Sequence, residues 1–305
     1  MYISQSLTLL ILLSTVSAQT KSSKRGLVYV PSPKHPLDDR WWDSSTSDLT
    51  WYYNYGSQPS PAFSNNSNFQ FVPMLWGAPS SSSDTTFLDD VTSLIKGGTN
   101  ISYVLTFNEP DGGDNGGSNV DAQIAAETWI REVEPLKQLG VKLGAPAVTG
   151  APTGFNWLQN FFTHCAGNCS ADFLPVHWYG NFEGLASHVG QVNGTYQNMT
   201  MWVTEYAQDH ATLEESQSFY NQSSQFFDRI DYITHYSYFG SFRSDASNVG
   251  PNAAMLTQKG DLTDIGSWYL GGTATGKVPK GAADKRGMFT GSSILIAMAT
   301  IWTLL

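Results

Sequence analysis

The stretch Ser102–Asp111, SYVLTFNEPD, decides the fold: a run of mostly apolar residues ends in Asn108, Glu109 and Pro110. The run has the length and composition of a buried strand, and Pro110 ends strand pairing and restricts the residue before it. A second stretch, Met201–Tyr206 (MWVTEY), has the same form, because an apolar run leads to Glu205. Each stretch therefore predicts a strand that carries a glutamate to its carboxyl end.

Counted outward from these two stretches, eight short β-type runs lie along the chain, with loop or helical segments between them. They are Gly26–Val30, Thr50–Tyr55, Phe71–Trp76, Ser102–Phe107, Lys142–Ala147, Phe173–Tyr179, Met201–Glu205 and Ile233–Phe239. Helical periodicity lies between some of them, over Thr86–Ile95, Val120–Leu139 and Leu213–Ile230.

Eight such alternations predict a (β/α)8 barrel, the TIM-barrel fold of the α/β class, as a single catalytic domain over residues 26–272. The rival architecture is an open, doubly wound sheet, which needs a glycine-rich phosphate turn after its first strand. The segment that follows the first run, Pro31-Ser32-Pro33-Lys34, is not such a turn.

The composition favours a neutral, hydroxylated ligand over a nucleic acid. Only 14% of the residues are charged while 13% are aromatic, and the formal net charge is −10. An acidic chain is a poor partner for phosphate backbones. Aromatic faces stack on sugar rings, whose hydroxyls bond to uncharged or singly charged groups, although many aromatic residues also fill the core.

The two glutamates form the candidate catalytic pair. In a barrel, functional residues gather at the carboxyl ends of the strands, and the fourth and seventh strands lie across the mouth from each other. Glycosidic cleavage needs one protonated carboxyl to assist the leaving oxygen and one ionised carboxyl to attack the anomeric carbon. We expect the carboxyls of Glu109 and Glu205 about 5 Å apart, as in retaining enzymes. The alternative for either glutamate alone is a solvated or ion-paired surface residue.

Other residues at the predicted strand ends are candidates for contacts with a sugar. They are Asn108, Trp76, Trp178, Tyr179, Tyr53, Asn54, Tyr238 and Phe239. His177 either bonds a sugar or orients Glu205, or it is a satisfied core histidine. Asp111 is expected to support the loop that holds Glu109, and Trp41-Trp42 to pack outside the barrel. No His, Asp or Cys cluster has metal-ligand spacing and no Gly-x-Ser-x-Gly motif occurs, so we expect no metal and no other cofactor.

Taken together, the motifs resemble glycoside hydrolase family 128, the fungal alkali-sensitive-linkage-protein-like group of clan A (β/α)8-barrel glucanases, over nearly all of the chain between its two ends. The resemblance rests on FVPMLWG (71–77), TFNEPD (106–111), GAPA (144–147), DFLPVHWYG (172–180), VTEY (203–206), NAAML (252–256) and WYL (268–270). It implies that Glu109 is the acid/base, that Glu205 is the nucleophile and that Asn108 bonds the sugar 2-hydroxyl.

The resemblance also implies endo-hydrolysis of β-1,3-glucan, the polysaccharide or oligosaccharide partner expected here. Two alternatives remain open. One is a wall-remodelling transglycosylase that passes the covalent intermediate to a second glucan. The other is a non-catalytic surface protein that binds β-glucan, which the presence of both glutamates and Asn108 argues against.

Both ends of the chain carry targeting signals. Residues 1–18 predict a cleaved signal peptide, with a buried helix as the alternative, and residues 19–25 a short arm. In this arm Lys24-Arg25 is either a dibasic processing site or a solvated pair. Residues 273–293 predict a linker with a lipid-attachment signal at Gly281-Ala282-Ala283, and the apolar segment 294–305 a removed GPI signal, with a packed terminal helix as the alternative. We expect a secreted monomer at the cell surface or wall, held to the membrane by a lipid anchor only.

Two further features fit an oxidising, extracellular compartment. Cys165 and Cys169, in CAGNC, predict a small disulfide loop. Six sequons are candidate glycosylation sites, at Asn65, Asn100, Asn168, Asn193, Asn198 and Asn221.

Overall fold

The computed structural model describes residues 21–44, 46–113 and 116–279. Its strands are β1 (Gly26–Val28), β2 (Trp51–Tyr53), β3 (Gln70–Phe71), β4 (Met74–Leu75), β5 (Tyr103–Asn108), β6 (Lys142–Ala147), β7 (Phe173–Tyr179), β8 (Thr200–Ala207) and β9 (Ile233–Tyr238). Its α-helices are α1 (Thr86–Lys96), α2 (Ala122–Glu132), α3 (Pro152–Cys165), α4 (Phe182–Thr195), α5 (Leu213–Arg229) and α6 (Asp264–Tyr269). Short 3-10 helices are η1 (Pro36–Trp41), η2 (Pro61–Phe63), η3 (Glu134–Leu139) and η4 (Pro251–Ala253).

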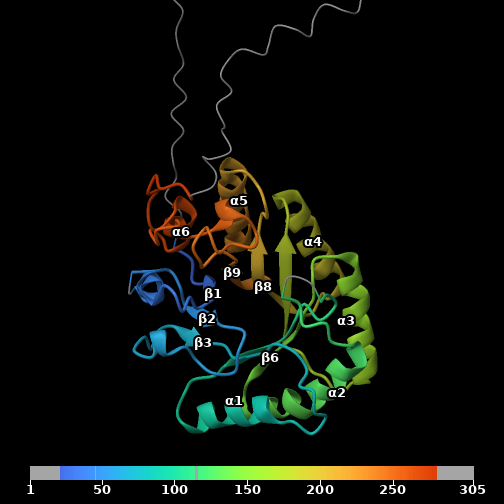
Figure 1. The fold of residues 1–305 in the computed structure, drawn as a ribbon. Coiled ribbons are helices and arrows are strands. Elements are labelled where there is room, and N and C mark those ends of the chain that lie inside the picture. Colours follow the sequence, from blue (N-terminus) through green and yellow to red (C-terminus); the bar gives the residue numbers. More distant parts are fainter. Residues whose placement is uncertain (1–20, 45, 114–115, 280–305) are drawn as a thin grey trace, which may run out of the picture.

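All neighbouring strands in the described sheets run parallel, in the orders β1-β2-β3 and β4 through β9 (Figure 1). β3 and β4 are two pieces of one predicted run, divided at Pro73, which has no N–H to donate to a ladder. β9 lies beside the start of β1, where the Tyr236 N–H donates to the Lys24 carbonyl and a parallel bridge joins Arg25 to Tyr236. The predicted (β/α)8 barrel is confirmed, with a ladder that is interrupted at these two places.

Some of the predicted strands and helices have the bounds seen in the structure, and others do not. β6 and β7 have the predicted bounds, whereas the helix predicted over Val120–Leu139 ends at Glu132 and continues as η3 because Pro135 interrupts it. α3 and α4 were not predicted. α4 contains Gly184, Gly190 and Gly194, which disfavour a helix, but Leu185, His188, Val189 and Val192 form a buried face at helical spacing.

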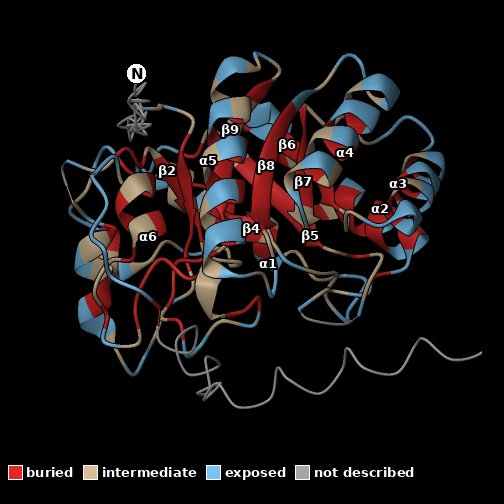
Figure 2. Cartoon of the chain, turned by 90° about the horizontal axis from the view of Figure 1, so that it is seen from above, coloured by how far each residue is buried: buried red, intermediate tan, exposed pale blue. Residues whose placement is uncertain are grey.

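The core has two layers. Inside the barrel, Trp51, Phe173 and Trp202 fill the space between the strands, and a larger apolar layer lies between strands and helices. Figure 2 shows the strands mostly buried and the helices exposed on part of their surface. A β-carbon on Gly144 would lie 2.7 Å from the Phe173 ring, so this strand position requires glycine. As predicted, Trp41 and Trp42 pack outside the barrel, where Trp42 is buried and the Trp41 indole donates to the Gly260 carbonyl.

The last residues of the short arm predicted over residues 19–25 pack against the barrel. The Lys24 ammonium donates to the carbonyls of Phe227, Asp228 and Ile230 at the end of α5. Arg25 is fully buried and forms an ion pair with Asp48 at 3.0 Å. The solvated-pair alternative for Lys24-Arg25 is therefore wrong, because Arg25 is buried and both side chains bond to distant parts of the fold.

Cys165 and Cys169 form the predicted disulfide at the end of α3. Four sequon asparagines, Asn100, Asn168, Asn193 and Asn198, lie in or beside connections that lead from a helix to the next strand. Such connections lie at the amino ends of the strands, opposite the functional face. Asn65 is exposed between η2 and β3, and Asn221 lies within α5.

The predicted signal peptide, the attachment signal and the apolar C-terminal segment lie outside the described residues. Within residues 21–44, 46–113 and 116–279, no helix has the length and apolar character that a membrane span requires.

Candidate active site

Glu109 lies directly after β5, where the backbone takes an unusual course. Phe107 and Glu109 have φ values of 30° and 44°, in the left-handed region that side chains rarely adopt. The Glu109 N–H donates to the Ala147 carbonyl at the end of β6. Asp111 supports the same loop, because its carboxylate accepts from the N–H and the hydroxyl of Thr149 at 2.8 and 2.5 Å. The carboxyl of Glu109 is thereby held at the mouth of the barrel.

Glu205 lies within β8 and its side chain is almost fully buried. Three phenol hydroxyls donate to its carboxylate: Tyr55 to Oε1 at 2.7 Å, Tyr53 to Oε1 at 3.4 Å and Tyr179 to Oε2 at 2.5 Å. Burial raises the pKa of all three phenols well above 10, and the charge of Glu205 adds to this effect. The phenols therefore stay protonated, and the two short O–H bonds from Tyr55 and Tyr179 favour the ionised form of Glu205.

His177 lies between the two glutamates. Its Nδ1 is 3.1 Å from Glu109 Oε1 and 3.5 Å from Glu205 Oε2, and the side chain is buried. Burial lowers the pKa of His177, but the charges of Glu205 and Glu109 outweigh this effect and raise it. Burial raises the pKa of Glu205, and the neighbouring Glu109 adds to the increase while His177 opposes it.

One donor atom from each of Glu109, His177 and Glu205 lies within 4.8 Å of the others. The two carboxyls are therefore as close as the sequence predicts for a retaining pair. Among the described residues this trio also has the spacing of a metal site. Tyr55 and Tyr179 donate to the two oxygens of Glu205, and His177 Nδ1 lies within hydrogen-bond distance of Glu109 Oε1.

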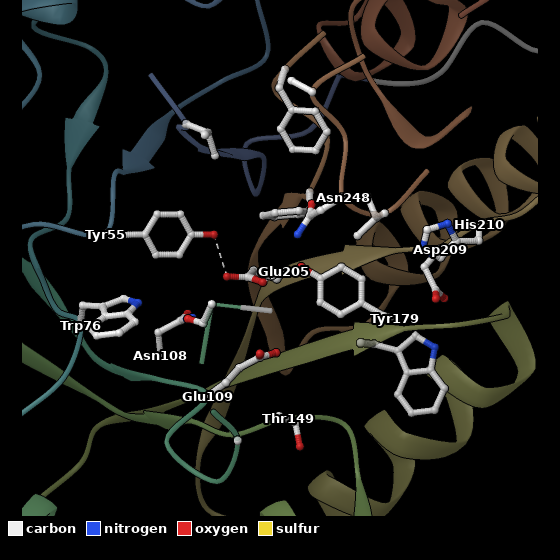
Figure 3. Close-up of a pocket in the computed structure, with 18 of the residues that line it drawn as sticks. Tyr55, Trp76, Asn108, Glu109, Thr149, Tyr179, Glu205, Asp209, His210 and Asn248 are labelled. Atoms are coloured by element: carbon white, nitrogen blue, oxygen red, sulfur yellow. Dashed lines mark hydrogen bonds between the residues drawn. The ribbon is translucent and has the colours of Figure 1, made fainter. Parts of the chain in front are cut away.

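The pair opens into a cleft of about 1450 Å³, larger than the roughly 300–1,000 Å³ typical of small-ligand sites. Figure 3 shows Glu109 and Glu205 pointing toward each other, with Tyr55 and Trp76 on one side and Asp209 and His210 on the other. Of the residues predicted to contact a sugar, the cleft lining includes Asn108, Trp76, Trp178, Tyr179 and Phe239. Asn108 is buried; its amide donates to the Gly116 carbonyl, while its Oδ1 has no partner among the described residues.

Three residues predicted to contact a sugar do not line the cleft. Tyr238 is fully buried in the outer core layer against Tyr206 and Tyr269, because it points away from the barrel interior. Tyr53 is fully buried beneath Glu205. The amide of Asn54 closes a turn by accepting from Gly56 N–H and donating to the Gln58 carbonyl.

The sequence reasoning missed several residues of the cleft. Tyr55 is the most important, since it contacts Glu205 directly. A signal was available, because Tyr55 is the last residue of the run Thr50–Tyr55, and functional residues gather at the carboxyl ends of barrel strands. The others missed are loop residues far apart in sequence, for which no local pattern exists: Lys34, His35, Thr149, Asp209, His210, Phe242, Arg243, Asp245 and Asn248.

Comparison with known proteins places the site in context. Residues 26–269 match the family model described as the glycosyl hydrolase catalytic core. Alkali-sensitive linkage protein 1 of Schizosaccharomyces pombe (strain 972 / ATCC 24843) is 28% identical over 258 residues, which make up 82% of this chain and 44% of that protein. The chain thus spans less than half the length of this curated relative.

Two solved structures are similar in fold and in sequence. A subgroup II endo-β-1,3-glucanase of glycoside hydrolase family 128 from Pseudomonas viridiflava superposes with a TM-score of 0.65 at 28% identity, over 84% of this chain and 100% of that one. A subgroup III curdlan-specific exo-β-1,3-glucanase of the same family from Blastomyces gilchristii, in complex with glucose, superposes with a TM-score of 0.65 at 27% identity, over 82% and 99%.

Proposed function

Because the chain belongs to the glycosyl hydrolase catalytic core family, and within it to glycoside hydrolase family 128, we propose that it is a retaining endo-β-1,3-glucanase. The observation that carries the retaining assignment is the close approach of Glu109 and Glu205, whose nearest atoms lie within 4.8 Å. Inverting enzymes hold their carboxyls roughly 6.5–9.5 Å apart, to leave room for a water molecule.

In the proposed mechanism Glu109 donates a proton to the glycosidic oxygen while Glu205 attacks the anomeric carbon. The C–O bond to the leaving glucan breaks as an ester bond to Glu205 forms. Glu109, now ionised, removes a proton from water, which attacks the anomeric carbon and releases Glu205. His177 Nδ1 lies 3.1 Å from Glu109 Oε1, and with a proton on Nδ1 it would stabilise the carboxylate that remains after Glu109 has given up its proton.

Action within a chain, rather than at its end, is supported by the aromatic lining of the cleft. Aromatic side chains line it on both sides of the glutamates: Tyr55 and Trp76 lie on one side, and Tyr179 lies on the other (Figure 3). Sugar units on both sides of the bond to be cleaved therefore have rings on which to stack.

The test is product analysis on laminarin-type glucan. The wild-type protein should release oligosaccharides of several lengths with β-anomers formed first, and Glu205→Gln should release none above background. Glucose as the first and only product would contradict internal cleavage, and products longer than the substrate would favour the transglycosylase.

We also propose that the protein is secreted and held at the cell surface by a lipid anchor. The terminal segments described above and the Cys165–Cys169 disulfide support this location. Phospholipase treatment of intact cells should release the protein without residues 294–305. Mass-spectrometric detection of that peptide on surface protein would contradict the anchor.

A further inference from the structure

Tyr55 is held in an unfavourable backbone conformation next to the catalytic pair. Its φ is 62°, in the left-handed region that glycine and asparagine tolerate and bulky residues avoid. The turn that imposes this conformation is well fixed: Asn54 bonds Gly56 and Gln58, and the Gly56 carbonyl accepts from Met74 N–H at 2.9 Å. Such outliers persist where surrounding structure demands them, and they are concentrated at functional sites.

The conformation brings the Tyr55 hydroxyl to one particular atom. It donates to Glu205 Oε1 at 2.7 Å, and the ring packs edge-on against Tyr53 at 5.1 Å. Tyr53 itself donates at 3.0 Å to the Thr204 carbonyl and is 3.4 Å from Oε1. Each carboxylate oxygen of Glu205 therefore accepts one short hydrogen bond, Oε1 from Tyr55 and Oε2 from Tyr179.

We propose that Tyr55 is a further catalytic residue, whose hydroxyl keeps Glu205 charged and directs its carboxylate into the cleft. This role rests on the proposed function, in which Glu205 attacks the sugar. Tyr55 lines the cleft as well, so the same hydroxyl lies where it can meet the bound sugar. When Glu205 forms its ester, the carboxylate charge disappears, and the hydroxyl becomes available to a sugar oxygen.

The charge balance around Glu205 makes this role testable. Apart from Tyr55, the titratable groups that face Glu205 are Tyr53 in β2, Glu109 after β5, and His177 and Tyr179 on β7. Burial and Glu109 favour the neutral carboxyl, while His177 and the phenols favour the carboxylate. Removal of the Tyr55 hydroxyl takes away one of the few stabilising contacts, so the pKa of Glu205 should rise.

The experiment compares Tyr55→Phe with Tyr238→Phe. Both variants lose one phenol oxygen from a largely buried ring, but the Tyr238 hydroxyl has no partner among the described residues and lies outside the cleft. Two readouts are measured: the acid limb of the kcat/KM profile on a laminari-oligosaccharide, and the titration of the Glu205 carboxyl by carbon NMR, with Glu205→Gln to assign its signal.

For Tyr55→Phe we expect both the acid limb and the carboxyl titration to move up by about one pH unit, since a hydrogen bond to a charged group contributes about that much. Tyr238→Phe should match wild type. The proposal would be overturned if the midpoints of the acid limb and of the carboxyl titration both stayed within about 0.3 pH units of the wild-type values. If the wild-type protein cleaves no glucan, the proposed function fails, but the NMR titration still decides whether Tyr55 holds the charge of Glu205.

Discussion

At the scale of single residues, the site combines strained backbone conformations with hydrogen bonds to a buried carboxylate. Phe107, Glu109 and Tyr55 all have positive φ values, and all three lie at or beside the cleft. Each such conformation costs about 1–3 kcal/mol, so the surrounding fold must hold it in place. The consequence is that Glu109 and Tyr55 are held close to Glu205 by the backbone of their loops.

Azide rescue should separate the roles of the two glutamates. In Glu109→Ala, glucan hydrolysis should fall by about 10²–10⁴, because no acid assists the leaving oxygen. An activated aryl laminari-oligosaccharide needs no such acid, so it should still form the ester with Glu205, and added azide should yield a β-glycosyl azide. Chromatography and proton NMR identify the product.

Glu205→Ala serves as the counterpart, since it lacks the nucleophile and can give only the α-azide. A β-azide from Glu205→Ala, or unchanged glucan hydrolysis by Glu109→Ala, would show that the assigned roles are wrong.

At the scale of elements, the predictable parts are those in which local pattern and tertiary packing agree. The strands that carry Glu109 and Glu205 could be predicted because they are apolar and each has a polar group at or near its carboxyl end. α4 could not, since its three glycines oppose the helix that its buried face stabilises. The burial of Tyr238 could not be predicted either, because the sequence does not determine which side of β9 faces the barrel interior.

The start of α5 offers a quantitative test of local stabilisation. The Thr212 hydroxyl accepts from Glu215 N–H, and the Glu215 carboxylate accepts from Thr212 N–H, which together form a capping box. Thr212→Ala should lower the free energy of unfolding by about 1 kcal/mol in urea denaturation.

Thr85→Ala is the control, because Thr85 precedes α1 without a capping hydrogen bond. Its cost should stay below about 0.5 kcal/mol, as for ordinary surface changes. Equal losses in the two variants would argue against a stabilising capping box.

At the scale of the whole molecule, the contact between the first and the last strand depends on residues from both ends of the described chain. Arg25 donates to Asp48, to the Tyr236 hydroxyl and to the carbonyls of Trp268 and Tyr269. It thus connects the start of β1 with β9 and with the end of α6. Proteolytic processing after Arg25 would remove this connection, so we expect the mature chain to retain it.

Arg25→Ala should lower the free energy of unfolding by about 3–5 kcal/mol, because the carboxylate of Asp48 would remain buried without its partner. Lys277→Ala, which breaks the exposed ion pair with Asp261, should change it by at most about 1 kcal/mol. Thermal and denaturant unfolding measure both. An Arg25→Ala protein as stable as Lys277→Ala would contradict this account of the contact between the first and the last strand.

One wall of the cleft is built from the first and last loops of the barrel. Asp38, in η1 after β1, accepts two hydrogen bonds from Arg243 after β9, at 2.6 and 2.8 Å. The two partners are 205 residues apart in the sequence, so Asp38 is synthesised long before Arg243. A nascent chain that ends before Arg243 therefore contains Glu109 and Glu205 but cannot yet form this wall of the cleft, which needs both partners.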